Sequence, residues 1–258
     1  MRLRSAICLL PLLALASCGP AEVKGSRSAA PSPDSLQRNF RTWYAYATSR
    51  TPLGSDFRPL SAEGVPMARK AFLEALGTGR FIALRTGDAP EYRLHPLTSP
   101  DKDIRMVVTS LARTQLAHDA RIGKPLPPFS FTDLEGRSYT TASTKGRYLV
   151  VKCWFIGCTA CVAEFPELNK LVEECRGRTD VQFLSLTLDK KPALEGFLKS
   201  LPFRYAVVAE AESYVTGPLG VDAYPHHLLV SPEGLVLQST NSLKDLLPVL
   251  RAHLQSKG

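Results

Sequence analysis

The sequence has little of several features that would assign it at once to a class. Only 6 of its 258 residues are cysteine, too few for a small domain held together by disulfides. The formal net charge is +8, but no run of five basic residues gathers it into a surface for nucleic acid. The N-terminal apolar run has about ten residues, too few to span a bilayer. A content of 44% hydrophobic and 22% charged residues excludes wholesale disorder and a collagen-like fibre.

The first twenty residues have the pattern of an export signal. Two arginines precede the apolar run, which ends in Leu-Ala-Ser-Cys-Gly at residues 15–19. This ending resembles the lipobox of bacterial lipoproteins and implies a signal peptide over residues 1–17 and lipid attachment at Cys18. Several acyl chains together give stable anchoring, and Gly19 slightly favours the outer membrane over the inner one. An ordinary secretory signal with a chance cysteine is the alternative.

Three further segments follow the signal. Residues 18–34 are rich in Ser, Ala, Pro and Lys and predict a flexible tether. Residues 35–121 show helical periodicity near 36–47, 66–76 and 102–121 with two short apolar runs between. They predict a smaller, mainly helical α+β domain, in which His95 and His118 are isolated imidazoles with surface or structural roles. A proline-rich joint at 123–128 opens the last segment, residues 122–258.

Strand and helix signals alternate through residues 122–258. An almost continuous apolar run at 148–155 is typical of a central strand, and one helix is predicted over 160–175, with a kink at Pro166. The pattern predicts an α/β fold, a mixed central sheet covered by helices. The remaining predicted elements are a hairpin at 129–139, strands at 181–188, 203–208, 226–230 and 236–239, and helices at 192–200 and 243–254.

Cys158 and Cys161 stand where the apolar strand gives way to the helix. A cysteine at a helix N-terminus faces unpaired backbone N–H groups and the positive end of the helix dipole, which favour its thiolate. The second cysteine follows one turn later, within reach of a short disulfide. We therefore predict that Cys158 attacks a substrate disulfide and that Cys161 resolves the mixed disulfide.

The surroundings of this pair resemble the thioredoxin superfamily, specifically its TlpA/ResA-like thiol–disulfide oxidoreductases in lipoprotein form. The resemblance covers about residues 122–254 and rests on four motifs. It implies a thioredoxin-like fold, no organic cofactor or metal, and a cis proline at Pro225 beside which the substrate chain pairs. It also implies that Glu164 exchanges a proton with Cys161. The motifs are Trp154-Phe-Ile-Gly-Cys-Thr-Ala-Cys161, Glu164-Phe-Pro166, Tyr224-Pro225 and Val230-Ser-Pro-Glu-Gly234.

Two departures from thioredoxin itself bear on tuning. Lys152 occupies the position of a buried aspartate, and we hypothesise that it pairs with Glu164 to tune Cys161. Thr159-Ala160 contains no histidine to stabilise the thiolate, which predicts a reducing potential. Of His226 and His227, strand alternation turns one toward the cysteine pair, and His226 is retained as the candidate tuning residue.

Other interpretations of the cysteines remain open. A zinc site would use the pair with one of the two histidines. A peroxiredoxin would require a threonine or serine at Phe155 and a proline at Val151, and the sequence fails to match at both positions. We expect Cys153 and Cys175 to be buried free thiols. An iron–sulfur site would combine these two with the pair, that is Cys153, Cys158, Cys161 and Cys175.

The sequence therefore predicts a membrane-anchored enzyme on the periplasmic side of the cell envelope that reduces protein disulfides. A membrane or periplasmic electron donor would restore its dithiol form, and nucleic acid is not expected as a partner. The alternative is a thioredoxin-fold binding or scaffold lipoprotein without redox turnover.

Overall fold

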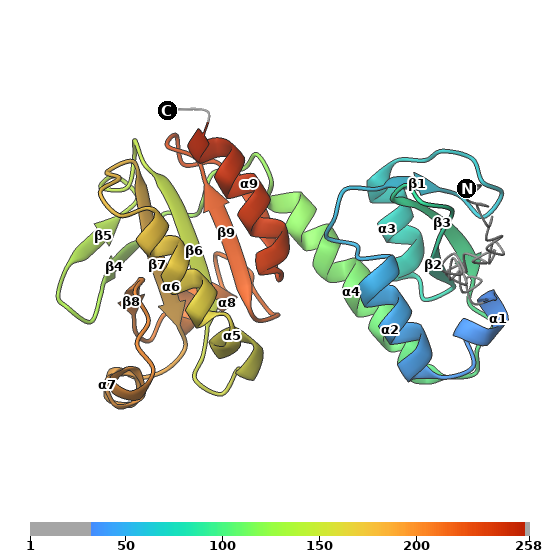
Figure 1. The fold of residues 1–258 in the computed structure, drawn as a ribbon, viewed down its shortest axis with the longest axis horizontal. Helices are drawn as coiled ribbons and strands as arrows, with labels where there is room; N and C mark the ends of the chain where they lie inside the picture. Colours follow the sequence, from blue (N-terminus) through green and yellow to red (C-terminus); the bar gives the residue numbers. More distant parts are fainter. Residues whose placement is uncertain (1–31, 256–258) are drawn as a thin grey trace, which may run out of the picture. The chain divides into compact units, whose positions relative to one another are not determined.

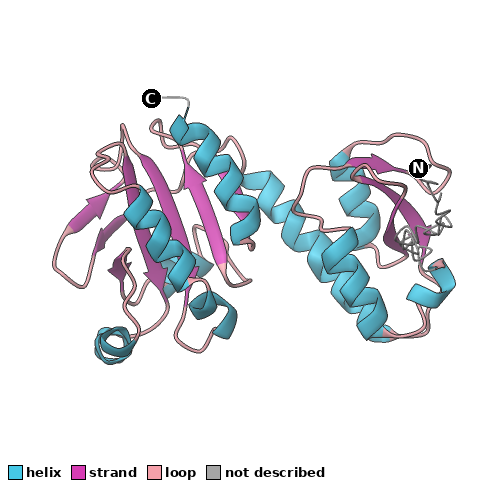
Figure 2. Ribbon diagram, in the orientation of Figure 1, coloured by secondary structure: helices cyan, strands magenta, loops and turns pink. Residues whose placement is uncertain are grey.

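The computed structural model describes residues 32–255, and residues 33–255 belong to one compact unit. The predicted signal peptide, Cys18 and most of the predicted tether lie outside the described residues. Among the helices between residues 32 and 255, none combines the length and apolarity needed to cross a membrane. Figure 1 traces the chain and Figure 2 distinguishes helices from strands.

The N-terminal region packs helices against a small sheet of strand order β1-β3-β2. Its core contains Trp43, Phe72, Ile82 and Ile104, which are all almost completely buried. Two predicted strands and the three long helices are confirmed, whereas β1 is additional, a three-residue strand that includes a proline. The elements are α1 (Pro33–Leu36), α2 (Phe40–Arg50), β1 (Arg58–Leu60), α3 (Arg69–Gly77), β2 (Phe81–Arg85), β3 (Glu91–Pro96) and α4 (Lys102–Arg121).

The C-terminal region is built on a five-stranded sheet of order β10-β9-β6-β7-β8, in which β9 runs antiparallel to both of its neighbours. The predicted fold class, a thioredoxin-like mixed sheet with helices, is confirmed. Its strands are the hairpin β4 (Ser130–Thr132) and β5 (Ser138–Thr140), then β6 (Tyr148–Trp154), β7 (Val181–Thr187), β8 (Ala206–Val208), β9 (His226–Val230) and β10 (Val236–Thr240). Its helices are α5 (Thr159–Ala163), α6 (Phe165–Glu174), α7 (Lys191–Ser200), α8 (Glu212–Thr216) and α9 (Leu243–Gln255).

The two faces of this sheet have separate apolar cores. Helices α6 and α9 cover one face (Figure 1), where their leucines pack around Val150, Trp154 and Leu229. On the other face, helix α8 and the β4–β5 hairpin pack against Val151, Leu228 and their neighbours. Strand alternation thus sends consecutive residues of β6 and β9 into different surroundings.

The structure corrects the expected single helix over 160–175. The helix is interrupted at Glu164, which ends α5 and precedes α6, so the break comes two residues before Pro166. Proline fits the first turn of a helix, where its missing N–H has no partner to lose. Helix α8 was not predicted. The division of the chain at 121/122 stays a prediction, and the joint after it is bound to the β9–β10 turn through Leu126 N–H and Gly234 C=O, 2.9 Å apart.

Candidate active site

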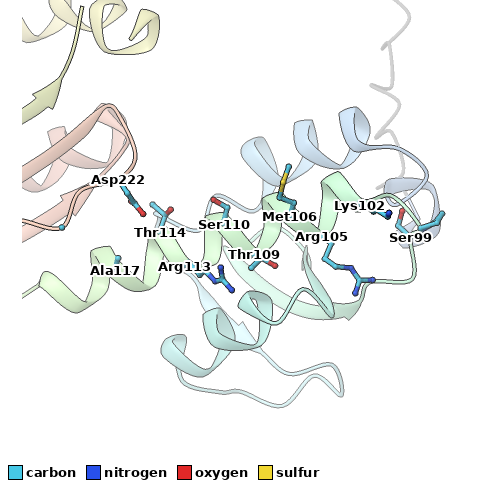
Figure 3. A pocket seen from close by; sticks show the side chains of 12 residues that line it. Ser99, Lys102, Arg105, Met106, Thr109, Ser110, Arg113, Thr114, Ala117 and Asp222 are labelled. Atoms are coloured by element: carbon cyan, nitrogen blue, oxygen red, sulfur yellow. The ribbon is translucent and has the colours of Figure 1, made fainter. Parts of the chain in front are cut away.

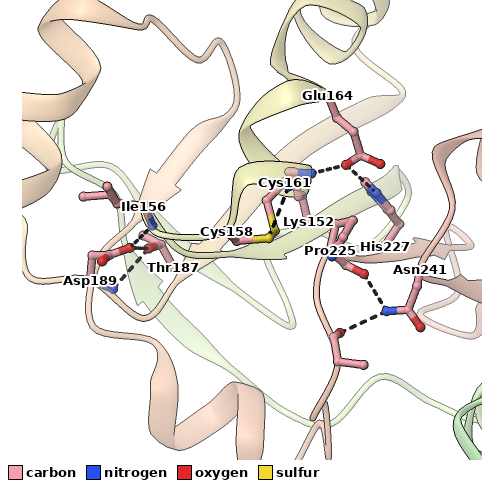
Figure 4. The surroundings of a disulfide bond; sticks show 11 residues. Lys152, Ile156, Cys158, Cys161, Glu164, Thr187, Asp189, Pro225, His227 and Asn241 are labelled. Carbon is pink, nitrogen blue, oxygen red and sulfur yellow. Dashed lines mark hydrogen bonds and ion pairs between the residues drawn. A yellow bond between two sulfur atoms is a disulfide. The ribbon is translucent and has the colours of Figure 1, made fainter. Parts of the chain in front are cut away.

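The two cysteines of the pair form a disulfide at the start of α5. Their Cα atoms are 5.2 Å apart, and the Cys161 backbone N–H donates to Cys158 Sγ at 3.2 Å. Cys158 is the residue that caps the helix, so its sulfur lies at the positive end of the helix dipole. Cys158 is 9% exposed and Cys161 is fully buried. Cys158 is therefore the more accessible residue of the pair, and Figure 4 shows the disulfide with its neighbouring side chains.

A carboxylate fixes the turn that leads into the pair. Asp189 Oδ2 accepts hydrogen bonds from the Ile156 backbone N–H at 2.8 Å and from Thr187 Oγ1 at 2.7 Å. The sequence interpretation missed this residue. Its position directly after β7, the parallel neighbour of β6, was the available signal, because the carboxyl ends of parallel strands meet at the same edge of a sheet.

A buried ionic cluster, formed by Lys152, Glu164 and His227, lies on the same face of the sheet as the cysteine pair. Lys152 and His227 are register partners on β6 and β9, and both side chains are completely buried. The Lys152 ammonium donates to Glu164 Oε2, and His227 Nε2 lies 3.0 Å from the same oxygen. Figure 4 shows the three side chains converging beside Cys161. The structure thus brings together the Lys152–Glu164 pair that the sequence interpretation hypothesised.

The cluster holds the Glu164 carboxylate in its ionised form. Burial by itself raises the pKa of Glu164, but the hydrogen bond from His227 and the charge of Lys152 outweigh it, and the pKa is lowered from 4.5. Burial also lowers the pKa of Lys152, partly offset by Glu164, and lowers the pKa of His227. A neutral His227 with its proton on Nε2 donates to Glu164, and its Nδ1 has no hydrogen-bond partner among the described residues.

The predicted cis proline belongs to a loop that faces the cysteine turn. The Tyr224–Pro225 peptide bond is cis, and the Tyr224 ring packs edge-on against Phe155 with centroids 5.5 Å apart. The Asn241 amide donates to the carbonyl oxygens of Ala223, at 2.9 Å, and Pro225. Asn241 is a second residue that the sequence interpretation missed.

His226 points to the opposite face of the sheet from its neighbour. Its register partner is Cys153, and its Nε2 lies 3.3 Å from Ser239 Oγ. The His118 ring of helix α4 lies 5.0 Å from the His226 ring. The predicted alternation is therefore observed, but it is His227 that contacts Glu164, and the structure does not bring His226 to the cysteine pair.

The remaining cysteines of the described residues, Cys153 and Cys175, are free and buried, as predicted. Burial raises the pKa of the Cys153 thiol to about 12. Because Cys153 faces away from Cys158 and Cys161, the four sulfurs do not converge as an iron–sulfur site requires. Between residues 32 and 255, no group of three or more His, Cys, Asp and Glu side chains is arranged to hold a metal ion.

A groove of about 900 Å³ runs along one side of α4 and reaches the loop before Pro225 at Gly220 and Asp222 (Figure 3). Lys102, Arg105 and Arg113 supply basic side chains to it. No cysteine lines the groove, so it is not the place where sulfur exchange occurs.

Comparisons with known proteins place the resemblance in the C-terminal half. The family model described as the AhpC/TSA family matches residues 122–239. The chain is 27% identical over 119 residues to the thiol-disulfide oxidoreductase ResA of a Bacillus cereus strain, an alignment that covers 46% of this chain and 68% of that protein. It is 39% identical over 54 residues to the thiol:disulfide interchange protein DsbE of Pseudomonas fluorescens biotype C, covering 20% of this chain and 30% of the relative.

Solved structures match the same half of the chain. A putative thiol:disulfide interchange protein DsbE from Chlorobium tepidum superposes with a TM-score of 0.47 and 21% identity, covering 53% of this chain and 98% of that one.

Proposed function

We propose that this chain is a TlpA/ResA-like thiol–disulfide oxidoreductase that acts through its C-terminal half and reduces protein disulfides from a lipid anchor in the cell envelope. The observation that supports attack by Cys158 is the unequal exposure of the pair, since Cys158 is 9% exposed and Cys161 is fully buried. Such a pair forms a mixed disulfide at one sulfur and resolves it with the other.

The reaction is a two-step exchange of sulfur–sulfur bonds. In the dithiol form, the Cys158 thiolate attacks one sulfur of the substrate disulfide, which breaks, and the second substrate sulfur leaves as a thiolate. Cys161 then loses its proton and attacks Cys158 Sγ, which releases the first substrate sulfur. The substrate has gained two electrons, and the enzyme holds the Cys158–Cys161 disulfide that the structure contains.

The ionic cluster supplies the proton chemistry of the second step. Glu164 is held ionised by Lys152 and His227, so it is ready to accept the proton of Cys161. The Lys152 ammonium places a positive charge on this face of the sheet, which favours the anions that form there. Lys152 is thus a tuning residue, and Glu164 is the proton acceptor.

The loop around Pro225 is the docking site for the substrate chain. It lies against Phe155, just before the cysteines, and an extended segment bound beside it presents its disulfide to Cys158. Backbone pairing of this kind recognises a chain with little dependence on its sequence.

The location in the cell follows from Cys18. Cleavage after residue 17 and acylation of Cys18 would tether residues 18–34 to the periplasmic side of a membrane, with the outer membrane slightly favoured by Gly19. Mass spectrometry of the purified protein should find acyl chains on Cys18, and a Cys18→Ser variant should move from the membrane fraction to the soluble envelope fraction. An unmodified Cys18 would indicate the ordinary secretory signal.

Each turnover leaves the Cys158–Cys161 disulfide, which a membrane or periplasmic electron donor must reduce by supplying two electrons and two protons. We expect a reduction potential nearer that of thioredoxin, about −270 mV, than that of DsbA, about −120 mV. A value above about −150 mV would instead indicate an oxidant.

The direct test compares wild type with Cys158→Ser in the reduction of insulin disulfides. We expect turnover only in the wild type, and mixed disulfides with envelope proteins to accumulate on a Cys161→Ser variant. Equal rates in wild type and Cys158→Ser would favour the scaffold alternative.

Peroxidase activity is not favoured, because Phe155 and Val151 occupy the positions where that chemistry places a threonine or serine and a proline.

A further inference from the structure

Helix α4 of the N-terminal region is connected to the loop before Pro225 by two sets of hydrogen bonds. Arg121, in its last turn, donates to the carbonyl oxygens of Leu219 and Gly220. His118, one turn earlier, lies 2.7 Å from Asn241 Oδ1 through its Nε2. Asn241 in turn donates to the carbonyls on either side of Tyr224.

The chemistry of the groups fixes the direction of each bond. Backbone carbonyls only accept, so the Asn241 NH₂ group must face Ala223 and Pro225 and its Oδ1 must face His118. His118 Nε2 is consequently the donor to Asn241. Both amide hydrogens and the amide oxygen of Asn241 are then engaged, which holds its side chain in one orientation.

The same reasoning extends to the other nitrogen of His118. Burial lowers the pKa of His118, so the ring is neutral and Nδ1 is an acceptor, 2.9 Å from Ser239 Oγ. The Ser239 hydroxyl donates to His118 and accepts from His226 Nε2. His118, Ser239 and His226 are each at most 3% exposed, and this relay, with Asn241, contains no charge.

We propose that His118 is a positioning residue for the substrate-docking loop and that it acts through Asn241. Resting on the function proposed above, the inference gives the N-terminal region a role in the reaction. Through Asn241, helix α4 fixes the backbone on both sides of Tyr224, next to Pro225 in the loop that we propose to dock the substrate chain. Arg121 supports the start of the same loop.

The test separates docking from sulfur chemistry by using two substrates on the full-length protein. A protein disulfide requires the loop, whereas a small aromatic disulfide such as 5,5′-dithiobis(2-nitrobenzoate) requires only Cys158. With His118→Leu we expect kcat/KM for the protein disulfide to fall roughly tenfold, the cost of one buried hydrogen bond, mainly through KM. The rate with the small disulfide and the reduction potential should not change.

Two amide variants test which nitrogen matters. In His118→Gln the side-chain NH₂ stands where Nε2 was and can still donate to Asn241, so we expect most of the activity to return. In His118→Asn the shorter amide reaches only the position of Nδ1, and the loss should match that of His118→Leu. Asn241→Ala should reproduce that loss, and the double variant should be no worse than either single one.

A buried residue of the same helix supplies the control for general destabilisation. Val108→Ala makes a cavity in the N-terminal core without touching the relay, and it should lower stability while leaving the ratio of the two rates unchanged. The proposal is overturned if His118→Leu slows both substrates equally or neither, or if Val108→Ala changes the ratio as much.

Hydrogen exchange of the backbone amides of residues 219–227 gives a readout that needs no turnover. Exchange should become faster in His118→Leu and Asn241→Ala and stay at the wild-type rate in Val108→Ala. Unchanged exchange would overturn the proposal even if insulin is not a substrate. Wild-type turnover equal to that of Cys158→Ser is a different result, because it contradicts the proposed function itself.

Discussion

His226 and His227 are neighbours in β9, yet they lie in different buried clusters on opposite faces of the central sheet. His227 joins the ionic cluster of Lys152 and Glu164 on the face of the cysteine pair. His226 joins a neutral relay with Ser239 and His118 on the face of helix α4. Because adjacent residues of a strand face opposite sides of the sheet, His227 lies in a charged environment next to the cysteine pair and His226 in an uncharged one that supports a loop.

The comparison shows two ways of burying polar groups, one built around a paired charge and one without any charge. In the ionic cluster, the charge of Lys152 depends on a single carboxylate, so removing that partner is costly. In the neutral relay, each donor meets an acceptor and no group depends on a charge. The two clusters should consequently respond differently to substitution and to pH.

The largest expected effect comes from breaking the ionic cluster. Glu164→Ala leaves the buried Lys152 ammonium without its partner, and we expect the free energy of unfolding of the oxidised protein to fall by about 3 kcal/mol. Urea denaturation measures it. An apolar side chain at residue 152 fills the same space without a charge. Lys152→Met combined with Glu164→Ala should therefore recover most of the lost free energy of unfolding. If Glu164→Ala and the double variant were equally stable, the buried Lys152 ammonium would not depend on Glu164 as its partner.

The neutral relay should respond to pH in the range where histidine titrates. The pKa of His226 is held well below 6.5 by burial, so the unfolded chain binds its proton more readily than the folded protein. Its contribution is fully favourable above pH 6.5 and is lost as pH falls below that value. Between pH 7 and pH 5 we expect the wild type to lose more stability than His226→Gln, whose amide can still donate to Ser239.

The ionic cluster also loses its contribution as pH falls, but in a lower pH range than the neutral relay. Because the pKa of Glu164 is lowered from 4.5, its stabilising contribution is fully present above that value and is lost as pH falls from there through the lower pKa of the folded protein. Denaturation curves for wild type and Glu164→Ala should therefore keep their separation down to about pH 4.5 and converge below it. A separation that closes between pH 7 and pH 5 would contradict the assignment.

A smaller effect is expected for Lys152→Met in the catalytic step. Loss of the cation should make the thiolate of the resolving cysteine harder to form and slow turnover severalfold. Alkylation rates across pH in a Cys158→Ser background measure the thiol pKa. The exposed Lys190 serves as the control, since Lys190→Met should alter neither quantity. An unchanged pKa and turnover in Lys152→Met would dismiss the tuning role.

The sequence alone could identify what local pattern encodes. The apolar strand, the cysteine pair at the helix start and Pro225 all lie within short motifs, and the fold class followed from alternating strand and helix signals. The break at Glu164 was misplaced by two residues, because the position of Pro166 marks a helix boundary without showing which turn it occupies.

The missed residues are those whose partners are distant in the chain. His118 was interpreted as an isolated imidazole, since its partner Asn241 is 123 residues away. The sequence indicated a role for Asp189 only weakly, because its hydrogen bonds depend on the pairing of β6 with β7. The choice between His226 and His227 also depended on register, which alternation alone leaves undetermined.

The smallest effect is predicted for Cys153, the residue that faces His226 across the two strands. Its thiol is fully buried and its pKa is raised to about 12, so almost no thiolate forms at neutral pH. In the fully reduced protein, iodoacetamide should modify Cys158 rapidly and leave Cys153 unmodified until the protein unfolds. Cys153→Ala should keep turnover within about twofold of the wild type, because a buried free cysteine acts mainly as a small apolar side chain. Rapid labelling of Cys153 in the folded protein would mean that the α4 face of the sheet opens to solvent, and the contrast between the two faces would then fail.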